Sequence, residues 1–188
     1  MLNDMKQPNI TLGISSCLLG NAVRYDGKHK RSDMICSIFS HLFDFQPFCP
    51  EVAIGLGIPR PPIQLVQQKT DEETQGIRVV EVQNRKQDYT VQLTQYAKKT
   101  VCTDFTAISG FIFKQSSPSC GMERVKVYKP DGTFLHQRGI GRFAQVIQQQ
   151  CPLLPVEEAE RLIDVKVREH FVQRVYAYYA CSLRNGMI

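Results

Sequence analysis

Short apolar runs alternate with stretches of helical period along most of the chain. Three runs have the β-branched or aromatic content of buried strands and are bounded by polar or turn-forming residues, at 10–14, 45–48 and 107–113. Two further segments favour strands, at 77–82 and, as a small edge strand, at 125–128. Residues 21–31 and 55–62 are rich in polar residues, Gly or Pro, so we expect loops there.

Helical patterns fill the intervals between these strands. Ser32 is a good N-cap residue, and Ile35, Phe39 and Leu42 follow it at the spacing of one helical face. Two more helices are expected, over 89–103 and 141–151. Because strands alternate with helices, the pattern predicts an α/β fold with a Rossmann-like, mostly parallel sheet flanked by helices. This domain is expected to span residues 10–156.

A final helical period covers 157–183 and sets residues 157–188 apart as a C-terminal helix. Its apolar stripe runs through Val167, Phe171, Val175 and Tyr178. Further aromatic residues lie off this stripe, so one buried face does not account for them. The helix therefore needs the sheet, a second copy of the chain or a further domain as its partner. We expect a homodimer contact or exposed aromatics on its outer face.

The composition is that of an ordinary globular protein with a mild basic excess. Of the 188 residues, 43% are hydrophobic and 22% charged, and the formal net charge is +5. The basic run at 28–31 fits either a solvated loop or a site for an anionic substrate or a nucleic-acid backbone. No stretch is apolar enough to span a bilayer, and residues 1–9 lack the apolar core of a signal peptide. A cytoplasmic location is therefore expected.

Seven cysteines are the informative part of the composition, because a reducing cytoplasm leaves them as core filler, nucleophiles or metal ligands. Cys17, Cys49 and Cys120 each lie at or shortly beyond the carboxyl end of a predicted buried strand. Sites in open parallel sheets form outside these ends, so three soft ligands can converge there. The pattern indicates an iron–sulfur cluster. Buried core thiols and a zinc site are the alternatives.

Three thiolates would leave one iron of a 4Fe–4S cluster without a protein ligand, whereas four would saturate the cluster. An open iron can act as a Lewis acid and bind a substrate sulfur. The other cysteines have a structural interpretation, because Cys36, Cys102 and Cys181 lie within helical patterns and Cys151 ends one.

Five short motifs surround these cysteines and the loops between them. They are Ile14-Ser-Ser-Cys-Leu-Leu-Gly20, Val23-Arg-Tyr-Asp-Gly27, Cys49-Pro-Glu-Val52, Pro59-Arg-Pro-Pro62 and Ser117-Pro-Ser-Cys-Gly121. In this order they resemble the thiouracil desulfidase (TudS-like) family, over about residues 10–156. The resemblance implies a 4Fe–4S cluster on Cys17, Cys49 and Cys120. It also implies removal of sulfur, as sulfide, from a thiolated nucleobase such as thiouracil, assisted by Glu51 and Ser117.

Desulfuration of a thiocarbonyl needs a thiophile, a proton carrier and an activated water. The open iron would be the thiophile, and Glu51, two residues after a ligand, would carry protons. Ser117 would position the water or relay its proton. The candidates for contacts to a small thiolated base or nucleoside are Tyr25, Asp26, Arg60 and Lys114. The structural alternative for each is an ordinary loop or surface residue.

The C-terminal region carries a second resemblance. Residues 155–164, followed by Arg168-Glu-His-Phe171, resemble the opening of the YbgA-like helical domain, which implies that only the first helix of that domain is present. Two other functions stay open, namely a non-catalytic iron–sulfur redox or sensor module and a protein that binds thiolated tRNA. The glycines at 139 and 141 open a predicted helix, whose N-terminus we expect to face the cysteine crevice or a nearby anion.

Overall fold

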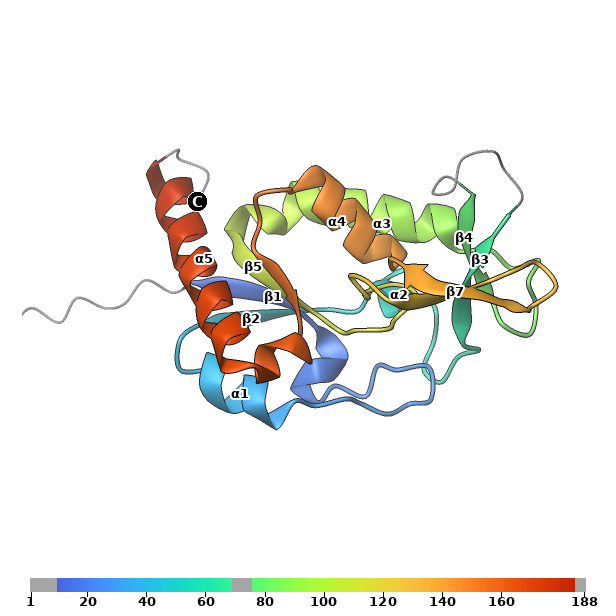
Figure 1. Ribbon diagram of the computed structural model, residues 1–188, viewed down its shortest axis with the longest axis horizontal. Helices are drawn as coiled ribbons and strands as arrows, with labels where there is room; N and C mark the ends of the chain where they lie inside the picture. Colours follow the sequence, from blue (N-terminus) through green and yellow to red (C-terminus); the bar gives the residue numbers. More distant parts are fainter. Residues whose placement is uncertain (1–9, 69–75, 185–188) are drawn as a thin grey trace, which may run out of the picture.

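The structure, a computed structural model shown in Figure 1, describes residues 10–68 and 76–184. The expectation about a signal peptide at 1–9 lies outside these residues. The first of its two sheets is wholly parallel, in the order β2 (Asp44–Phe48), β1 (Thr11–Ser15), β5 (Ile108–Phe113) and β8 (Val156–Glu158). The three predicted buried strands all belong to it, which confirms an α/β fold with a parallel sheet.

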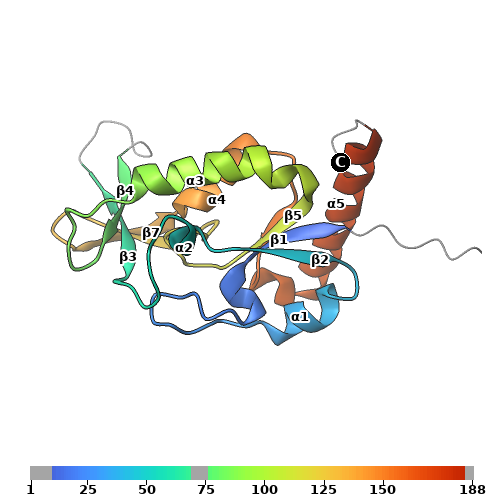
Figure 2. The same cartoon turned by 180° about the vertical axis from the view of Figure 1, so that it is seen from behind.

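Helices cover both faces of the parallel sheet (Figures 1 and 2). On one face lie α3 (Thr90–Thr103) and α4 (Arg142–Gln150), where Phe143 packs with Phe111 and Phe113 of β5. On the other face lie α1 (Asp33–Phe39) and α5 (Val165–Arg184), where the rings of Phe39 and Phe171 approach to 6.1 Å. The sheet is therefore the middle of three layers, and its carboxyl ends stay uncovered by these helices.

Two local features follow directly from single residues. Ser32 caps α1 as predicted, because its hydroxyl accepts a hydrogen bond from the Ile35 amide at 3.4 Å. Leu42 lies beyond the end of this helix and is 37% exposed, so it does not belong to the buried stripe. In β1, a Cβ on Gly13 would lie 2.3 Å from Cδ2 of Phe111, so only glycine lets β1 and β5 pair around that ring.

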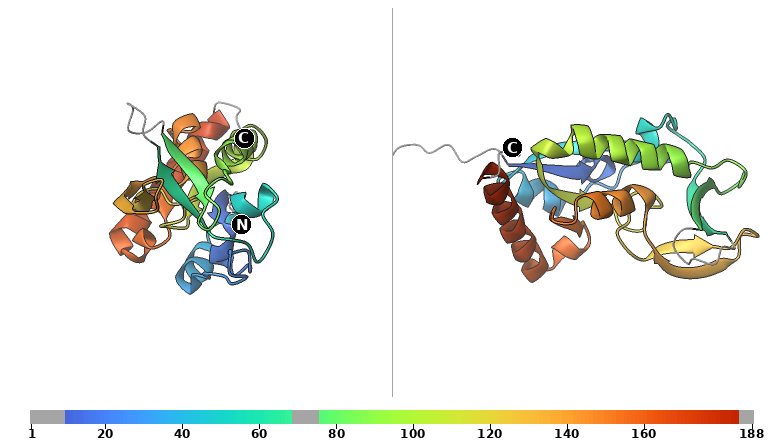
Figure 3. Two further views of the ribbon diagram at one scale, coloured as in Figure 1. Left: turned by 90° about the vertical axis from the view of Figure 1, so that its right-hand side faces the viewer. Right: turned by 90° about the horizontal axis from the view of Figure 1, so that it is seen from above.

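A second sheet lies at the opposite end of the molecule from α5, as Figure 3 shows from above. Its order is β4 (Ile77–Glu81), β3 (Ile63–Gln67), β6 (Val125–Tyr128) and β7 (Phe134–Gly139), with one parallel and two antiparallel pairs. Since β6 pairs on both sides, the prediction of an edge strand at 125–128 is wrong. The pattern missed its partners because β3 follows a proline-rich run and β7 is largely polar.

The C-terminal helix begins later than its sequence period indicates. Residues 157–164 form the end of β8 and a 3-10 turn (Arg161–Ile163), and α5 starts at Val165. Asp164 Oδ1 accepts hydrogen bonds from the amides of Lys166 and Val167, which is the geometry of an N-cap. The helix packs on the sheet through fully buried Phe171 and Val175.

Three tyrosines of α5 are only partly covered. Tyr176 is 39% exposed, although its ring lies 5.6 Å from that of Phe43, and Tyr178 and Tyr179 are half-buried. A dimer through this helix stays a prediction. Within residues 10–68 and 76–184, no helix has both the length and the apolar character needed to cross a membrane.

Candidate functional site

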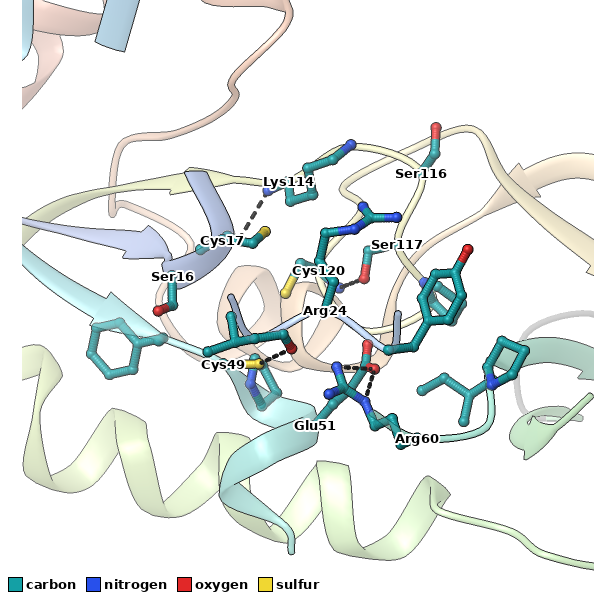
Figure 4. Close-up of a pocket in the computed structure, with 18 of the residues that line it drawn as sticks. Ser16, Cys17, Arg24, Cys49, Glu51, Arg60, Lys114, Ser116, Ser117 and Cys120 are labelled. Atoms are coloured by element: carbon teal, nitrogen blue, oxygen red, sulfur yellow. Dashed lines mark hydrogen bonds and ion pairs between the residues drawn. The ribbon is translucent and has the colours of Figure 1, made fainter. Parts of the chain in front are cut away.

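The carboxyl ends of β1, β2 and β5 border a cavity of about 280 Å³. Cys17, Cys49 and Cys120 all line it, together with Glu51 and Ser117 (Figure 4). The three thiols come from distant parts of the chain and converge because parallel strands end at the same edge of a sheet. The structure therefore brings together the predicted ligands and both predicted catalytic residues.

Each cysteine is placed by a short turn after its strand. Cys17 lies in a 3-10 turn (Ser16–Leu19) that follows β1, and its carbonyl accepts a hydrogen bond from the Lys30 amide at 2.9 Å. Cys49 is the N-cap of α2 (Pro50–Ala53), which follows β2. Cys120 lies further from its strand, in the loop between β5 and β6, and is buried.

The N-terminus of α4 holds the Cys120 loop in place. The amides of Gly141, Arg142, Phe143 and Ala144 donate to the carbonyls of residues 118, 119 and 121 at 2.7–3.2 Å. The helix does point at the cysteine crevice, but these donors are already used. The expectation that this N-terminus faces the crevice is confirmed, and the group bound to its first amides is the Cys120 loop rather than an anion.

Burial favours the protonated form of all three thiols. Desolvation raises the pKa of Cys17, Cys49 and Cys120, most strongly for the fully buried Cys120. Repulsion between the thiolates adds to this effect in Cys17 and Cys120, because their negative charges would share one cavity. A positively charged centre would reverse the balance and stabilise three thiolates together.

Smaller interactions favour the thiolate forms. Lys114 and Arg24 act on the Cys17 thiol, and a hydrogen bond from the Ser15 hydroxyl acts on Cys120, in each case against the larger effect of burial. Burial also lowers the pKa of Lys114, which Glu160 and Cys17 oppose. The Lys114 ammonium donates to the Gln115 carbonyl at 2.9 Å.

Glu51 is held by two residues rather than exposed on α2. Its Oε2 accepts hydrogen bonds from Nε and Nη2 of Arg60, at 2.9 and 2.8 Å. Its Oε1 accepts a hydrogen bond from the Ser119 hydroxyl at 2.9 Å. The Arg60 side chain is only 5% exposed and that of Glu51 15%, so this ion pair lies inside the molecule.

The Ser117 hydroxyl oxygen has a structural role as well as a place in the cavity wall. It accepts hydrogen bonds from the amides of Ser119 and Cys120, at 3.2 and 3.1 Å. This is the turn function that a serine at the start of such a loop commonly has. Its O–H hydrogen is not used by these two bonds, because the oxygen accepts in both.

The structure places three of the four predicted substrate contacts in the cavity wall. Tyr25, Arg60 and Lys114 line the cavity, whereas Asp26 does not. The Asp26 carboxylate instead accepts from the Lys28 amide and the Arg24 guanidinium, which shapes the turn at 24–28. The Arg24 guanidinium lies 5.4 Å from the centre of the Tyr25 ring.

The basic run 28–31 borders a second cavity of about 230 Å³, which Lys30 and Arg31 line together with Lys114 and Glu160. Because Lys114 also lines the first cavity, the two are neighbours. Lys30 and Arg31 of this run therefore lie beside the site. The sequence alone was compatible with either a solvated loop or a site for an anion there.

Ser15, Arg24 and Ser119 belong to the site but were not among the residues predicted for it. Ser119 lies in the same motif as Ser117, and the sequence alone does not tell which serine reaches Glu51. Ser15 follows the alternation of β1, since its side chain accepts from the Lys114 amide at 2.9 Å. Its place inside the first motif, two residues before Cys17, was the available signal.

Known proteins resemble the chain in both sequence and structure. The sequence pattern of the 2-thiouracil desulfurase family matches residues 12–159. The uncharacterized protein YbbK of Bacillus subtilis (strain 168) is 29% identical over 140 residues, which cover 72% of this chain and 88% of YbbK. A solved structure described as 4Fe–4S-dependent thiouracil desulfidase TudS matches with a TM-score of 0.63 and 26% identity, over 86% of this chain and 99% of that one. This protein belongs to the 2-thiouracil desulfurase family.

Proposed function

We propose that this protein is an iron–sulfur-dependent desulfidase that removes sulfur, as sulfide, from a thiolated nucleobase such as thiouracil. The observation that carries the proposal is the convergence of three thiols and a fixed carboxylate around one cavity. The family of the chain and the described activity of TudS support the same reaction class. A non-catalytic redox or sensor module would give no role to the Glu51 carboxylate, which Arg60 and Ser119 hold in place.

Cys17, Cys49 and Cys120 would hold a 4Fe–4S cluster. Their donor set fits, because thiolates are the ligands of such clusters and each one binds a different iron. Among residues 10–68 and 76–184, no three His, Cys, Asp or Glu side chains are arranged to hold a metal ion, and iron quantitation with the visible absorption of reconstituted protein decides between the cluster and zinc on the same thiols. When bound, the cluster would offer one iron without a protein ligand as a thiophilic Lewis acid.

The proposed reaction exchanges sulfur for oxygen without net redox change. A thiocarbonyl and water give a carbonyl and hydrogen sulfide, so the carbon–sulfur bond breaks and a carbon–oxygen bond forms. Glu51 takes a proton from the attacking water at Oε1, the oxygen that accepts only one hydrogen bond within the protein. That proton then leaves with the sulfide, and the second proton of the water is released as the carbonyl forms and completes hydrogen sulfide. Ser117 donates its free O–H hydrogen to the water or to the substrate.

The remaining walls of the cavity would bind the base. A volume of about 280 Å³ is just below the roughly 300–1,000 Å³ of ordinary ligand pockets, and because the cluster would share it, it suits a substrate no larger than one ring. Tyr25 offers an aromatic surface for that ring, and Lys114 offers a cation at the border with the second cavity. We place the protein in the cytoplasm, where a reducing environment matches seven unpaired cysteines.

The proposal is tested with anaerobically reconstituted protein and 2-thiouracil in water enriched in oxygen-18. Uracil and sulfide should appear in equal amounts, and the uracil should carry one oxygen-18 atom. Protein that binds iron and sulfide but leaves thiouracil intact would instead be a redox or sensor module. Tight, steeply salt-dependent binding of thiolated tRNA without sulfide release would favour the tRNA-binding alternative.

A further inference from the structure

We propose that Arg60 is a positioning residue that acts through Glu51, together with Ser119, and not a substrate contact. The inference rests on the proposed function, in which Glu51 carries the proton of the attacking water. Arg60 was expected to touch the substrate, but its Nε and Nη2 both donate to Glu51 Oε2, at 2.9 and 2.8 Å. Two donors fix the position of Oε2, and the Ser119 hydroxyl on Oε1 fixes the orientation of the carboxylate.

The guanidinium is itself fixed on its other side. Nη1 donates to the Gly57 carbonyl at 3.2 Å, and the Arg60 amide donates to the Tyr25 carbonyl at 2.9 Å. The side chain is 5% exposed, so water does not compete for these contacts. A planar guanidinium offers several donors in a rigid arrangement, which a lysine ammonium does not reproduce.

Ser119 holds the other carboxylate oxygen from the opposite side of the site. Its hydroxyl donates to Glu51 Oε1 at 2.9 Å, and the residue is fully buried. Its amide donates to Ser117, and its carbonyl accepts from the amides of Phe143 and Ala144 at the start of α4. Ser119 therefore connects Glu51 to the loop that carries Cys120, and the carboxylate keeps a constant place relative to that thiol.

The consequence concerns which lone pairs of Glu51 are available. Oε2 accepts two hydrogen bonds and Oε1 accepts one, so the remaining acceptor position of the carboxylate lies on Oε1. A proton carrier works when its oxygen is within reach of the water and correctly oriented. Loss of the Arg60 contacts should therefore slow the chemical step and leave substrate binding intact.

The test compares Arg60→Lys, Glu51→Gln and the double variant in steady-state turnover of 2-thiouracil by cluster-loaded protein. Arg60→Lys keeps the charge but loses the two-donor contact, and its kcat should fall by about 100-fold with KM within about twofold of wild type. In the Glu51→Gln background the same change should alter kcat by less than about threefold. Ser119→Ala should show the same dependence on Glu51. Arg78→Lys, which alters an ion pair with Asp88 in the second sheet, should retain wild-type kcat.

A raised KM with unchanged kcat in Arg60→Lys, or effects of Arg60→Lys and Glu51→Gln that multiply, would show a substrate contact and overturn the inference. Measurements of iron content and urea unfolding show whether a variant has lost activity by misfolding or by displacement of the Glu51 carboxylate. Wild-type protein that releases no sulfide would defeat the proposed function. Even then, urea unfolding tests the contact between Arg60 and Glu51. The loss of stability caused by Arg60→Lys should largely vanish in the Glu51→Gln background, and an additive loss of stability in the double variant would overturn the inference.

Discussion

Cys17, Cys49 and Cys120 differ from the other cysteines of the chain in their surroundings. They share one cavity, whereas Cys102 and Cys181 are exposed on helices and Cys36 lies within α1. The motifs around the three thiols, and Glu51 beside the second, were readable in the sequence. The partners of Glu51 were not, because no local pattern says that Arg60 turns back to it or that Ser119, rather than Ser117, reaches it.

The first residue-scale prediction concerns the ligands. Cys120→Ala should lower the iron retained after anaerobic reconstitution by at least about tenfold, since metal sites lose affinity steeply when their shell is disturbed. Iron quantitation and the visible absorption of the protein measure this. Cys36→Ala, a matched loss of a partly buried thiol outside the cavity, should retain wild-type iron. Equal iron in both variants would show that Cys120 is not a ligand of the cluster.

The second residue-scale prediction concerns a buried carboxyl group that binds the loop carrying Cys120. Glu158 is 1% exposed, its Oε1 accepts from the Met122 amide at 2.9 Å, and burial raises its pKa. A raised pKa in the folded state means that the stability from this group is fully present below its ordinary pKa and is lost as the pH rises through the raised pKa. Glu158→Gln removes the charge and keeps an acceptor for Met122.

The free energy of unfolding of Glu158→Gln should therefore rise relative to wild type as the pH increases from the ordinary carboxyl pKa through the raised pKa of Glu158. Urea unfolding at several pH values measures the difference. Glu169→Gln, a change at an exposed position on α5, should follow the wild-type curve in parallel. A Glu158→Gln curve that is also parallel to wild type would show that burial does not control this carboxyl group.

At the scale of elements, periodicity located α1, α3, α4 and α5 and the three strands of the parallel sheet that carry the site, but not the four-residue α2. It failed where tertiary contacts override local preference. β3, β7 and β8 form because buried or paired neighbours are available, although their own sequences are short, polar or follow prolines. The glycines before α4 predicted that its N-terminus faces the cysteine crevice, and it does, with the Cys120 loop rather than an anion bound to its first amides.

The prediction for α4 concerns Gly141. A Cβ at this position would lie 2.5 and 2.6 Å from the carbonyl carbon and oxygen of Ser119, so backbone must move to admit it. Gly141→Ala should cost about 1–3 kcal/mol of stability and also lower the retained iron, because the displaced loop carries Cys120. Gln149→Gly, at the exposed C-terminal turn of α4, should cost about 1 kcal/mol and leave iron unchanged. If Gly141→Ala retained as much iron as the wild type, α4 would not control the position of the Cys120 ligand.

The prediction for α5 concerns its attachment to the sheet. Phe171 is fully buried among residues of α1 and β1. Phe171→Ala should therefore reduce the free energy of unfolding by about 3–5 kcal/mol, while the change at its exposed neighbour, His170→Ala, should stay within about 0.5 kcal/mol. Urea unfolding measures both. A small effect of Phe171→Ala would mean that α5 behaves as the start of a separate domain, as the YbgA-like resemblance implies.

At the scale of the whole molecule, one arrangement explains the site. A parallel sheet brings three strand ends to one edge, helices close both of its faces, and the second sheet and its loops complete the cavity wall with Arg60 and Ile63. The α/β class and the site at the strand ends follow from general rules about parallel sheets. The second sheet does not, because its parallel pair joins segments some sixty residues apart that no local pattern connects.

The central claim is that sulfide release from a thiolated base depends on an iron–sulfur cluster held by Cys17, Cys49 and Cys120. The most direct test measures both quantities on the same samples, prepared anaerobically with graded iron loading and supplied with 2-thiouracil. Sulfide release per chain should rise in proportion to bound iron and extrapolate to zero in iron-free protein. Release by iron-free protein, or none by fully loaded protein, would contradict the account.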